Sequence, residues 1–130
     1  SHFVAPNLLT VQRCIELTMA SAGLQPQDID YINAHATSTK IGDQVEADAL
    51  GNAFSKKVPP VSANKSQLGH AMGASSAIEV ILAMEGMLRD TVLPTINYVP
   101  DPSMTIDCVP EGARTLTGIC FKKCVWLRRL

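Results

Sequence analysis

The stretch YINAHATSTKIGDQVEADAL, residues 31–50, decides the fold that we expect for this chain. It opens with a short run typical of a buried strand, continues with a segment crowded with hydroxyl and charged groups, and ends with apolar residues at helical spacing. We therefore predict a strand at 31–34, a polar loop, and a helix that starts at Asp43 with Asp43 and Glu46 as its N-cap and N3 residues. A polar loop that follows a strand is a common position for a functional site.

The three hydroxyl side chains of this loop, Thr37, Ser38 and Thr39, have two interpretations. Hydroxyl groups before a helix most often satisfy backbone groups that the helix leaves unpaired, which favours a capping role. They could also hydrogen-bond the amides of a flexible ligand. Pattern alone favours the caps.

The same kinds of pattern predict the remaining elements. A helix over residues 8–22 is expected from the spacing of its apolar residues, and Gly23 is placed to end it. We further expect a strand at 61–64, a glycine-punctuated loop at 65–73, a helix at 73–89 buried on most sides with its small-residue end packed closely, extended segments at 93–102 and 104–114, and a last strand at 119–127. Alternating strands and helices indicate an α/β domain with a mixed sheet covered by helices.

The composition excludes several functional classes. The chain has 130 residues, 46% of them hydrophobic and 18% charged, with a formal net charge of −1, which suits one domain or part of one and gives no nucleic-acid surface. Its cysteines show no CxxC spacing, so neither a zinc site nor a disulfide framework is expected; they are Cys14, Cys108, Cys120 and Cys124. No apolar stretch reaches the ~20 residues of a membrane span. We expect a soluble protein of a reducing compartment: the cytoplasm, or a mitochondrion or plastid.

Two histidines, His35 and His70, lie in separate loops that each follow a predicted strand. Such loops can converge at one edge of a sheet. A neutral imidazole can then donate a hydrogen bond to a developing oxyanion while its other nitrogen is held by the backbone. The alternative is that each is an ordinary loop histidine.

Lys65 and Glu79 are a second candidate pair. A carboxylate inside the apolar run of the 73–89 helix needs a cation or hydrogen-bond donors to offset its desolvation, and Lys65 is a candidate partner. A metal site built from His2 with the other two histidines is disfavoured because no histidine pair has ligand spacing. Nothing resembles a phosphate-binding glycine loop. We predict no metal and no cofactor of the chain's own.

Four segments together resemble the C-terminal half of β-ketoacyl-acyl-carrier-protein synthases, most closely the elongating type II enzymes of fatty-acid synthesis. They are NAHATST (33–39), GD (42–43), VSANKSQLGHAMGASSAIE (61–79) and LPTINYVPDP (93–102). The resemblance runs from about residue 3 to residue 118. It implies a thiolase-like fold of which this chain is one half, completed by a first half of the synthase and forming a homodimer.

The resemblance also implies a reaction. His35 and His70 would flank a cysteine nucleophile supplied by the first half and would donate hydrogen bonds to the thioester carbonyl of a malonyl group, stabilising the enolate that forms as carbon dioxide leaves. The enolate would attack the acyl group on the cysteine, which makes the complete protein a 3-oxoacyl-[acyl-carrier-protein] synthase, an acyltransferase.

Four further residues take roles from the same resemblance. Thr37 and Thr39 match the threonines that bind the phosphopantetheine arm of the acyl carrier protein, the expected partner. Lys65 and Glu79 match an ion pair behind the site. Substrates would be carried on that arm, so no separate cofactor is implied.

The chain departs from the family at several points. Ala36 stands where many members have glycine, and GICFKKCVWLRRL (118–130) replaces a strand with a glycine-rich gating loop. We therefore divide the chain into a ketosynthase C-terminal domain, 1–118, and a divergent tail, 119–130, that leaves a sheet edge exposed. No cysteine lies in the family's nucleophile context, so the chain alone is not expected to catalyse condensation.

Three other hypotheses stay open at this point. The chain could be a non-catalytic module that binds pantetheine or a carrier protein, an interaction fragment that dimerises through sheet edges, or a piece of a polyketide ketosynthase, because fatty-acid and polyketide synthases share these motifs.

Overall fold

The computed structural model describes residues 6–104, 106–110, 112–115, 119–122 and 125–128. Its helices are α1 (Leu8–Ala22), α2 (Lys40–Ala53), α3 (Lys65–Leu68) and α4 (Ser75–Leu88), with 3-10 turns η1 (Pro26–Asp28) and η2 (Met72–Ala74). Its strands are β1 (Tyr31–Asn33), β2 (Val61–Ser62), β3 (Thr91–Val92), β4 (Arg114–Thr115), β5 (Ile119–Lys122) and β6 (Val125–Arg128).

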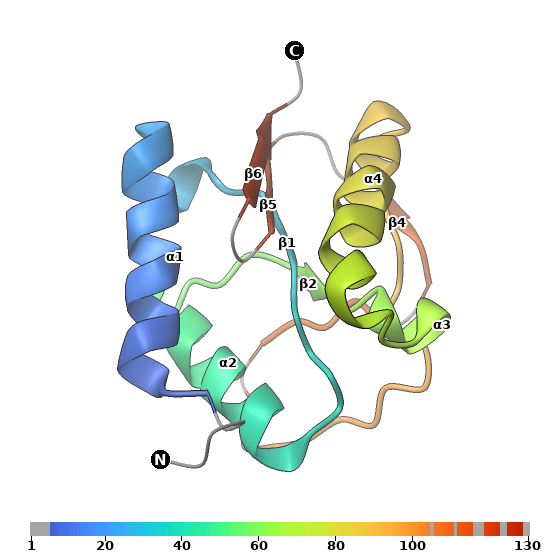
Figure 1. Cartoon of the computed structure of the whole chain (residues 1–130), viewed down its shortest axis with the longest axis horizontal. Coiled ribbons are helices and arrows are strands. Elements are labelled where there is room, and N and C mark those ends of the chain that lie inside the picture. Colours follow the sequence, from blue (N-terminus) through green and yellow to red (C-terminus); the bar gives the residue numbers. More distant parts are fainter. Residues whose placement is uncertain (1–5, 105, 111, 116–118, 123–124, 129–130) are drawn as a thin grey trace.

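A mixed sheet forms the centre of the molecule, as predicted. Its strand order is β2-β1-β5-β6, with β1 parallel to both β2 and β5, and β5 antiparallel to β6. Figure 1 shows α1 and α4 on opposite sides of this sheet. Parallel neighbours need crossover connections, and α2 supplies the one between β1 and β2.

Two apolar clusters hold the layers together, because successive residues of β1 face opposite sides of the sheet. Ile32 packs with buried residues of α1 and α2, among them Ile15 and Leu50. Tyr31 faces the other way, against Ala83 of α4 and Val109. Three consecutive residues of β1 are therefore buried, which explains why this strand carries no exposed polar position.

Helix α1 forms as its sequence predicts. Asn7 caps its N-terminus by accepting a hydrogen bond from the Thr10 amide at 3.1 Å. Its buried face consists of Val11, Ile15 and Met19. Gly23 ends the helix with φ of +67°, a left-handed conformation that glycine adopts without steric cost.

Helix α4 contradicts the prediction that it is buried on most sides. Only its face with Ser75, Glu79 and Ala83 is buried. Exposed apolar side chains cover the other faces, including Ile81 at 60% and Leu88 at 68% exposure. Most of its small-residue start is exposed too. Within the described residues, the chain covers only one side of this apolar helix.

The C-terminal segment also differs from the expectation. A single strand was predicted for 119–127, whereas the structure has two, β5 and β6, in an antiparallel pair. Since β5 pairs with β1, the segment set apart as a divergent tail contributes to the same sheet as the preceding domain. β6 lies at the outer edge of that sheet. The boundary at residue 118 itself lies outside the described residues.

The 65–73 segment is more ordered than a simple loop. It contains the short helix α3 and the start of η2, with Gly69 between them at φ of +74°. Separately, none of the helices in the described part of the chain is long and apolar enough to cross a membrane.

The core gives a direct stability test. Ile15→Ala removes a side chain that is 1% exposed, so we expect a loss of about 2–5 kcal/mol in the free energy of unfolding, from lost burial and the cavity left behind. Leu9→Ala, at a position 73% exposed on the same helix, is the matched control and should change little. Urea unfolding followed by circular dichroism measures both; equal effects would contradict this description of α1.

Candidate active site

The two predicted histidines lie side by side. The ring centroids of His35 and His70 are 5.6 Å apart, with the ring planes at 89° in an edge-to-face arrangement. β1 and β2 run parallel with Asn33 opposite Ser62, so the segments that follow them leave the sheet at the same edge. The two loops therefore converge in the structure, as expected. The catalytic role of the histidines stays a prediction.

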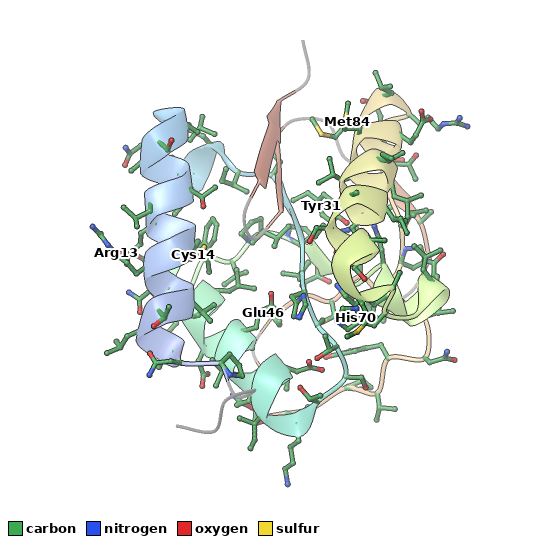
Figure 2. The ribbon with its side chains drawn as sticks, viewed as in Figure 1. Arg13, Cys14, Tyr31, Glu46, His70 and Met84 are labelled. Atoms are coloured by element: carbon green, nitrogen blue, oxygen red, sulfur yellow. The ribbon has the colours of Figure 1, made fainter. Side chains whose placement is uncertain are left out.

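Glu46 of α2 holds the His35 loop in place. Its carboxylate accepts two hydrogen bonds, from the His35 amide to Oε1 at 2.9 Å and from the Ala36 amide to Oε2 at 2.8 Å. Glu46 is 8% exposed, and a buried carboxylate of this kind needs such donors. The loop backbone is thereby fixed to the first turns of α2. Figure 2 shows Glu46 and His70 in the central part of the molecule, between α2 and α4.

This arrangement corrects the predicted start of the second helix. α2 begins at Lys40 with Thr39 as N-cap, not at Asp43, and the Asp43 amide already donates to the Thr39 carbonyl oxygen at 2.9 Å. Glu46 therefore does not act as the N3 residue of a capping box. Its side chain reaches back past the helix start to the His35 and Ala36 amides of the loop.

The hydroxyl group of Thr39 does not cap the helix. Thr39 makes no side-chain capping bond; its Oγ1 lies 3.3 Å from that of Thr37. Gly42 permits this position, because a Cβ at residue 42 would collide with the Thr39 hydroxyl. Ala36 and Ser38 have positive φ values of 28° and 62°, a conformation that L residues rarely adopt. The capping interpretation is therefore wrong for Thr39.

Lys65 and Glu79 form a buried ion pair, as the sequence suggested. The Lys65 ammonium donates to Glu79 Oε1, and the two side chains are 5% and 2% exposed. Two charges removed from water in this way must satisfy each other, so the contact ties α3 to α4. The loop that carries His70 lies between these two helices.

A third segment supports the second loop from outside. Thr95 Oγ1 accepts from the Ala63 amide at 3.1 Å, and the Ile96 amide donates to Ser66 Oγ at 3.1 Å. Gln67 donates to the Pro94 carbonyl oxygen at 2.8 Å. Residues 94–96 therefore hold the start of this loop through hydrogen bonds that involve both backbone and side-chain groups.

A cavity of about 590 Å³ opens beside the two loops. Thr37, Ser38, Lys65 and His70 contribute to its wall from the loops. Much of the remaining wall is apolar and comes from α2, β2 and the 95–108 segment; it includes Ala47, Leu50, Val61, Ile96, Val99 and Ile106. A cavity with a few polar groups at one side and apolar walls is typical of a small-molecule site.

Four ionisable groups of the cavity wall have shifted pKa values, and two of them, Asp43 and Cys108, bear on the chemistry; the others are Tyr98 and Asp101. Burial raises the pKa of the Asp43 carboxyl, helped by the negative charge of Glu46 and opposed by the amides of Thr39 and Ser38. Burial also raises the pKa of the Cys108 thiol, and a hydrogen bond with Tyr98 opposes that shift only in part. A thiol held in its protonated form is a poor nucleophile.

No cluster of three or more histidine, cysteine, aspartate or glutamate side chains suited to a metal ion occurs among the described residues. His2, which entered the metal alternative, lies outside them.

Comparison with known proteins shows which family this chain resembles. The family described as "Beta-ketoacyl synthase, C-terminal domain" matches residues 1–99. The 3-oxoacyl-[acyl-carrier-protein] synthase 2 of Mycobacterium leprae is 42% identical over 116 residues, which is 87% of this chain and 28% of that protein.

The chain belongs to the β-ketoacyl synthase family, as a C-terminal domain. It spans just over a quarter of the length of that relative.

Solved structures of ketosynthases share the fold of this ketosynthase domain. The ishigamide ketosynthase/chain length factor superimposes with a TM-score of 0.90 at 35% identity, covering 94% of this chain and 31% of that one. A type II polyketide synthase ketosynthase, in complex with its acyl-carrier protein, gives a TM-score of 0.85 at 31% identity, covering 91% and 30%. The thiolase-like α/β fold is therefore established, and its match extends beyond residue 99.

Sequence reasoning assigned Glu46 to a helix cap and missed what it holds. The only local signal was an acid in the first turns of a helix that follows a polar loop, and a capping box gives the same signal. It likewise placed Cys108 in an extended stretch without seeing that the 95–108 segment forms one wall of the cavity.

The Glu46 contact can be tested by substitution. In Glu46→Gln, one side-chain oxygen becomes an amide donor that faces a backbone amide, so we expect a loss of about 1–3 kcal/mol in the free energy of unfolding and shifted amide resonances for His35 and Ala36. Glu85→Gln is the control, since Glu85 pairs with Arg89 at an exposed site. Unmoved resonances in a folded Glu46→Gln protein would exclude the contact.

The raised pKa of Cys108 predicts a pH dependence. Because only the thiolate reacts, alkylation by iodoacetamide should be slow at neutral pH and should accelerate only above the pH range ordinary for thiols. Mass spectrometry can follow it, since Cys108 is the only cysteine between Arg89 and Arg114. In urea the same site should label in the ordinary range. Fast labelling of the folded protein at neutral pH would show that the thiol is not desolvated.

Proposed function

We propose that this chain is the C-terminal catalytic domain of a 3-oxoacyl-[acyl-carrier-protein] synthase, in which His35 and His70 stabilise an enolate during decarboxylative condensation. The observation that carries the proposal is the meeting of the two imidazole rings, 5.6 Å between centroids, beside a cavity of about 590 Å³. Its sequence relative bears the name of that enzyme. Because the chain is a fraction of that protein's length, activity belongs to the completed protein.

The proposed chemistry needs two hydrogen-bond donors aimed at one oxygen. When the carboxylate of a malonyl thioester leaves as carbon dioxide, its bonding electrons pass into the thioester and negative charge develops on the carbonyl oxygen. The N–H groups of two imidazoles can share that charge without any proton transfer. The closeness of the His35 and His70 rings, 5.6 Å between centroids, supports this proposal because donors on neighbouring rings can serve one oxygen.

Carbon–carbon bond formation then needs an acyl thioester on a cysteine. The enolate carbon attacks the acyl carbonyl carbon, the cysteine thiolate leaves, and the product is a 3-oxoacyl thioester. Cys108 is a poor candidate for this nucleophile because its thiol is held protonated by burial. We infer that the nucleophile comes from the preceding part of a complete ketosynthase.

The uncovered face of α4 supports such a partner. Ile81, Met84 and Leu88 are 60%, 47% and 68% exposed on one helix, and Figure 2 shows Met84 toward its C-terminal end. A helix with apolar residues on several faces is normally buried. The first part of the synthase is the proposed cover. A homodimer of the completed protein remains a prediction.

The proposed carrier of the substrates is an acyl carrier protein. A structural neighbour at 31% identity is a ketosynthase in complex with its acyl-carrier protein. In this chain Thr37 lines the cavity, its Oγ1 lies 3.3 Å from that of Thr39, and both hydroxyl groups could hydrogen-bond the amides of a phosphopantetheine arm. No metal or redox group is required for the proposed steps.

A substitution at His70 tests the proposal. The chain is joined to the N-terminal part of a related ketosynthase, and release of carbon dioxide from malonyl-carrier protein is measured. Loss of one oxyanion donor in His70→Ala should lower the rate by about 10²–10³-fold.

Two matched variants accompany it. His70→Gln retains a side-chain N–H and should keep part of the rate, whereas Ser21→Ala, on the exposed side of α1, should keep all of it. If the joined protein decarboxylates malonyl groups equally well with and without the His70 side chain, the proposed role of His70 is wrong.

A further inference from the structure

The ring of His70 is held on one nitrogen by two groups. The Met72 amide donates to Nδ1 at 3.1 Å, and Ser75 Oγ lies 2.9 Å from the same nitrogen. Met72 has a positive φ of 48°. Ser75 is 5% exposed and is the first residue of α4.

The Met72 contact favours one role for each ring nitrogen. A backbone amide can only donate, so while this bond is made Nδ1 presents its lone pair and a neutral ring carries its hydrogen on Nε2. Met72 is 77% exposed, so water competes for this contact and it does not by itself fix the tautomer. A hydroxyl can donate to the same lone pair because its hydrogen rotates freely. With both contacts in place, Nε2–H is the group left to act as a donor.

We propose that Ser75 is a positioning residue for His70, whose hydroxyl holds Nδ1 and keeps the imidazole as an Nε2–H donor. The proposal rests on the proposed function only for the use made of the Nε2–H donor. Which ring nitrogen carries the hydrogen does not depend on any reaction.

The surroundings of Ser75 favour this role over helix capping. The N-cap residue of α4 is Ala74, which has no hydrogen-bonding side chain, whereas the Ser75 hydroxyl contacts the His70 ring. Ser75 and Glu79 are four residues apart on the buried face of α4, and Glu79 pairs with Lys65 just before the His70 loop. One rigid helix face therefore holds both sides of that loop.

Ser76 offers a matched control. It has the same side chain, lies next in the sequence and belongs to the same helix, but it is exposed and away from the buried face. Any general effect of removing a hydroxyl from the start of α4 should appear equally at both positions.

The experiment reads the tautomer of His70 directly in the full chain. Protein labelled with ¹⁵N-histidine is examined by long-range ¹H–¹⁵N correlation, which distinguishes the two neutral tautomers, and His70→Gln identifies the signals of this ring. We expect the Nε2–H pattern for the wild type and for Ser76→Ala. Ser75→Ala should lose that exclusive pattern, and Ser75→Thr should retain it because the hydroxyl is kept.

The outcomes separate clearly. An unchanged His70 pattern in folded Ser75→Ala would overturn the proposal, and so would equal changes in Ser75→Ala and Ser76→Ala. If Ser75→Ala does not fold, Ser75→Cys replaces it: its thiol is a weak hydrogen-bonding group of similar size, and an unchanged pattern there overturns the proposal in the same way. Since no activity is measured, failure of the condensation assay would leave this result in place.

Discussion

The parallel pairing of β1 with β2 is the constraint on which the site depends. With Asn33 opposite Ser62, both strands end at the same level, and the segments that follow must start from one edge of the sheet. The pairing continues for one step beyond the strand, since the Ala34 amide donates to the Ser62 carbonyl oxygen at 2.9 Å. Two imidazoles separated by thirty-five positions of sequence thereby come within contact of each other.

Strand pairing brings the loops together, but charged side chains keep them in shape. Glu46 ties the first loop to α2 through two backbone amides, and Lys65 with Glu79 ties the second to α4. Each of these groups is nearly removed from water, where an unpaired charge would be strongly unfavourable. One of these contacts is made by the amide of Ala36, a residue with positive φ, which is a strained conformation for an L residue.

This chain fits the proposal that it is one part of a longer ketosynthase. Its family relative is more than three times as long, and α4, apolar on several faces, is covered on one. A helix of this composition would be energetically costly in water if nothing packed against Ile81 and Leu88. In the proposed function, the first part of the synthase both covers α4 and supplies the nucleophilic cysteine.

The sequence by itself determined the elements and the chemistry of the loops. Spacing of apolar residues predicted α1 and its end at Gly23, strand-forming runs predicted β1 and β2, and a carboxylate in an apolar helix predicted a partner for Glu79. Only the tertiary structure decided that Glu46 bonds the His35 loop, that Ser75 meets His70, and that the C-terminal segment forms two strands. Local patterns report periodicity and burial preference, whereas the partner of a polar side chain depends on which distant segment the fold brings within hydrogen-bonding distance.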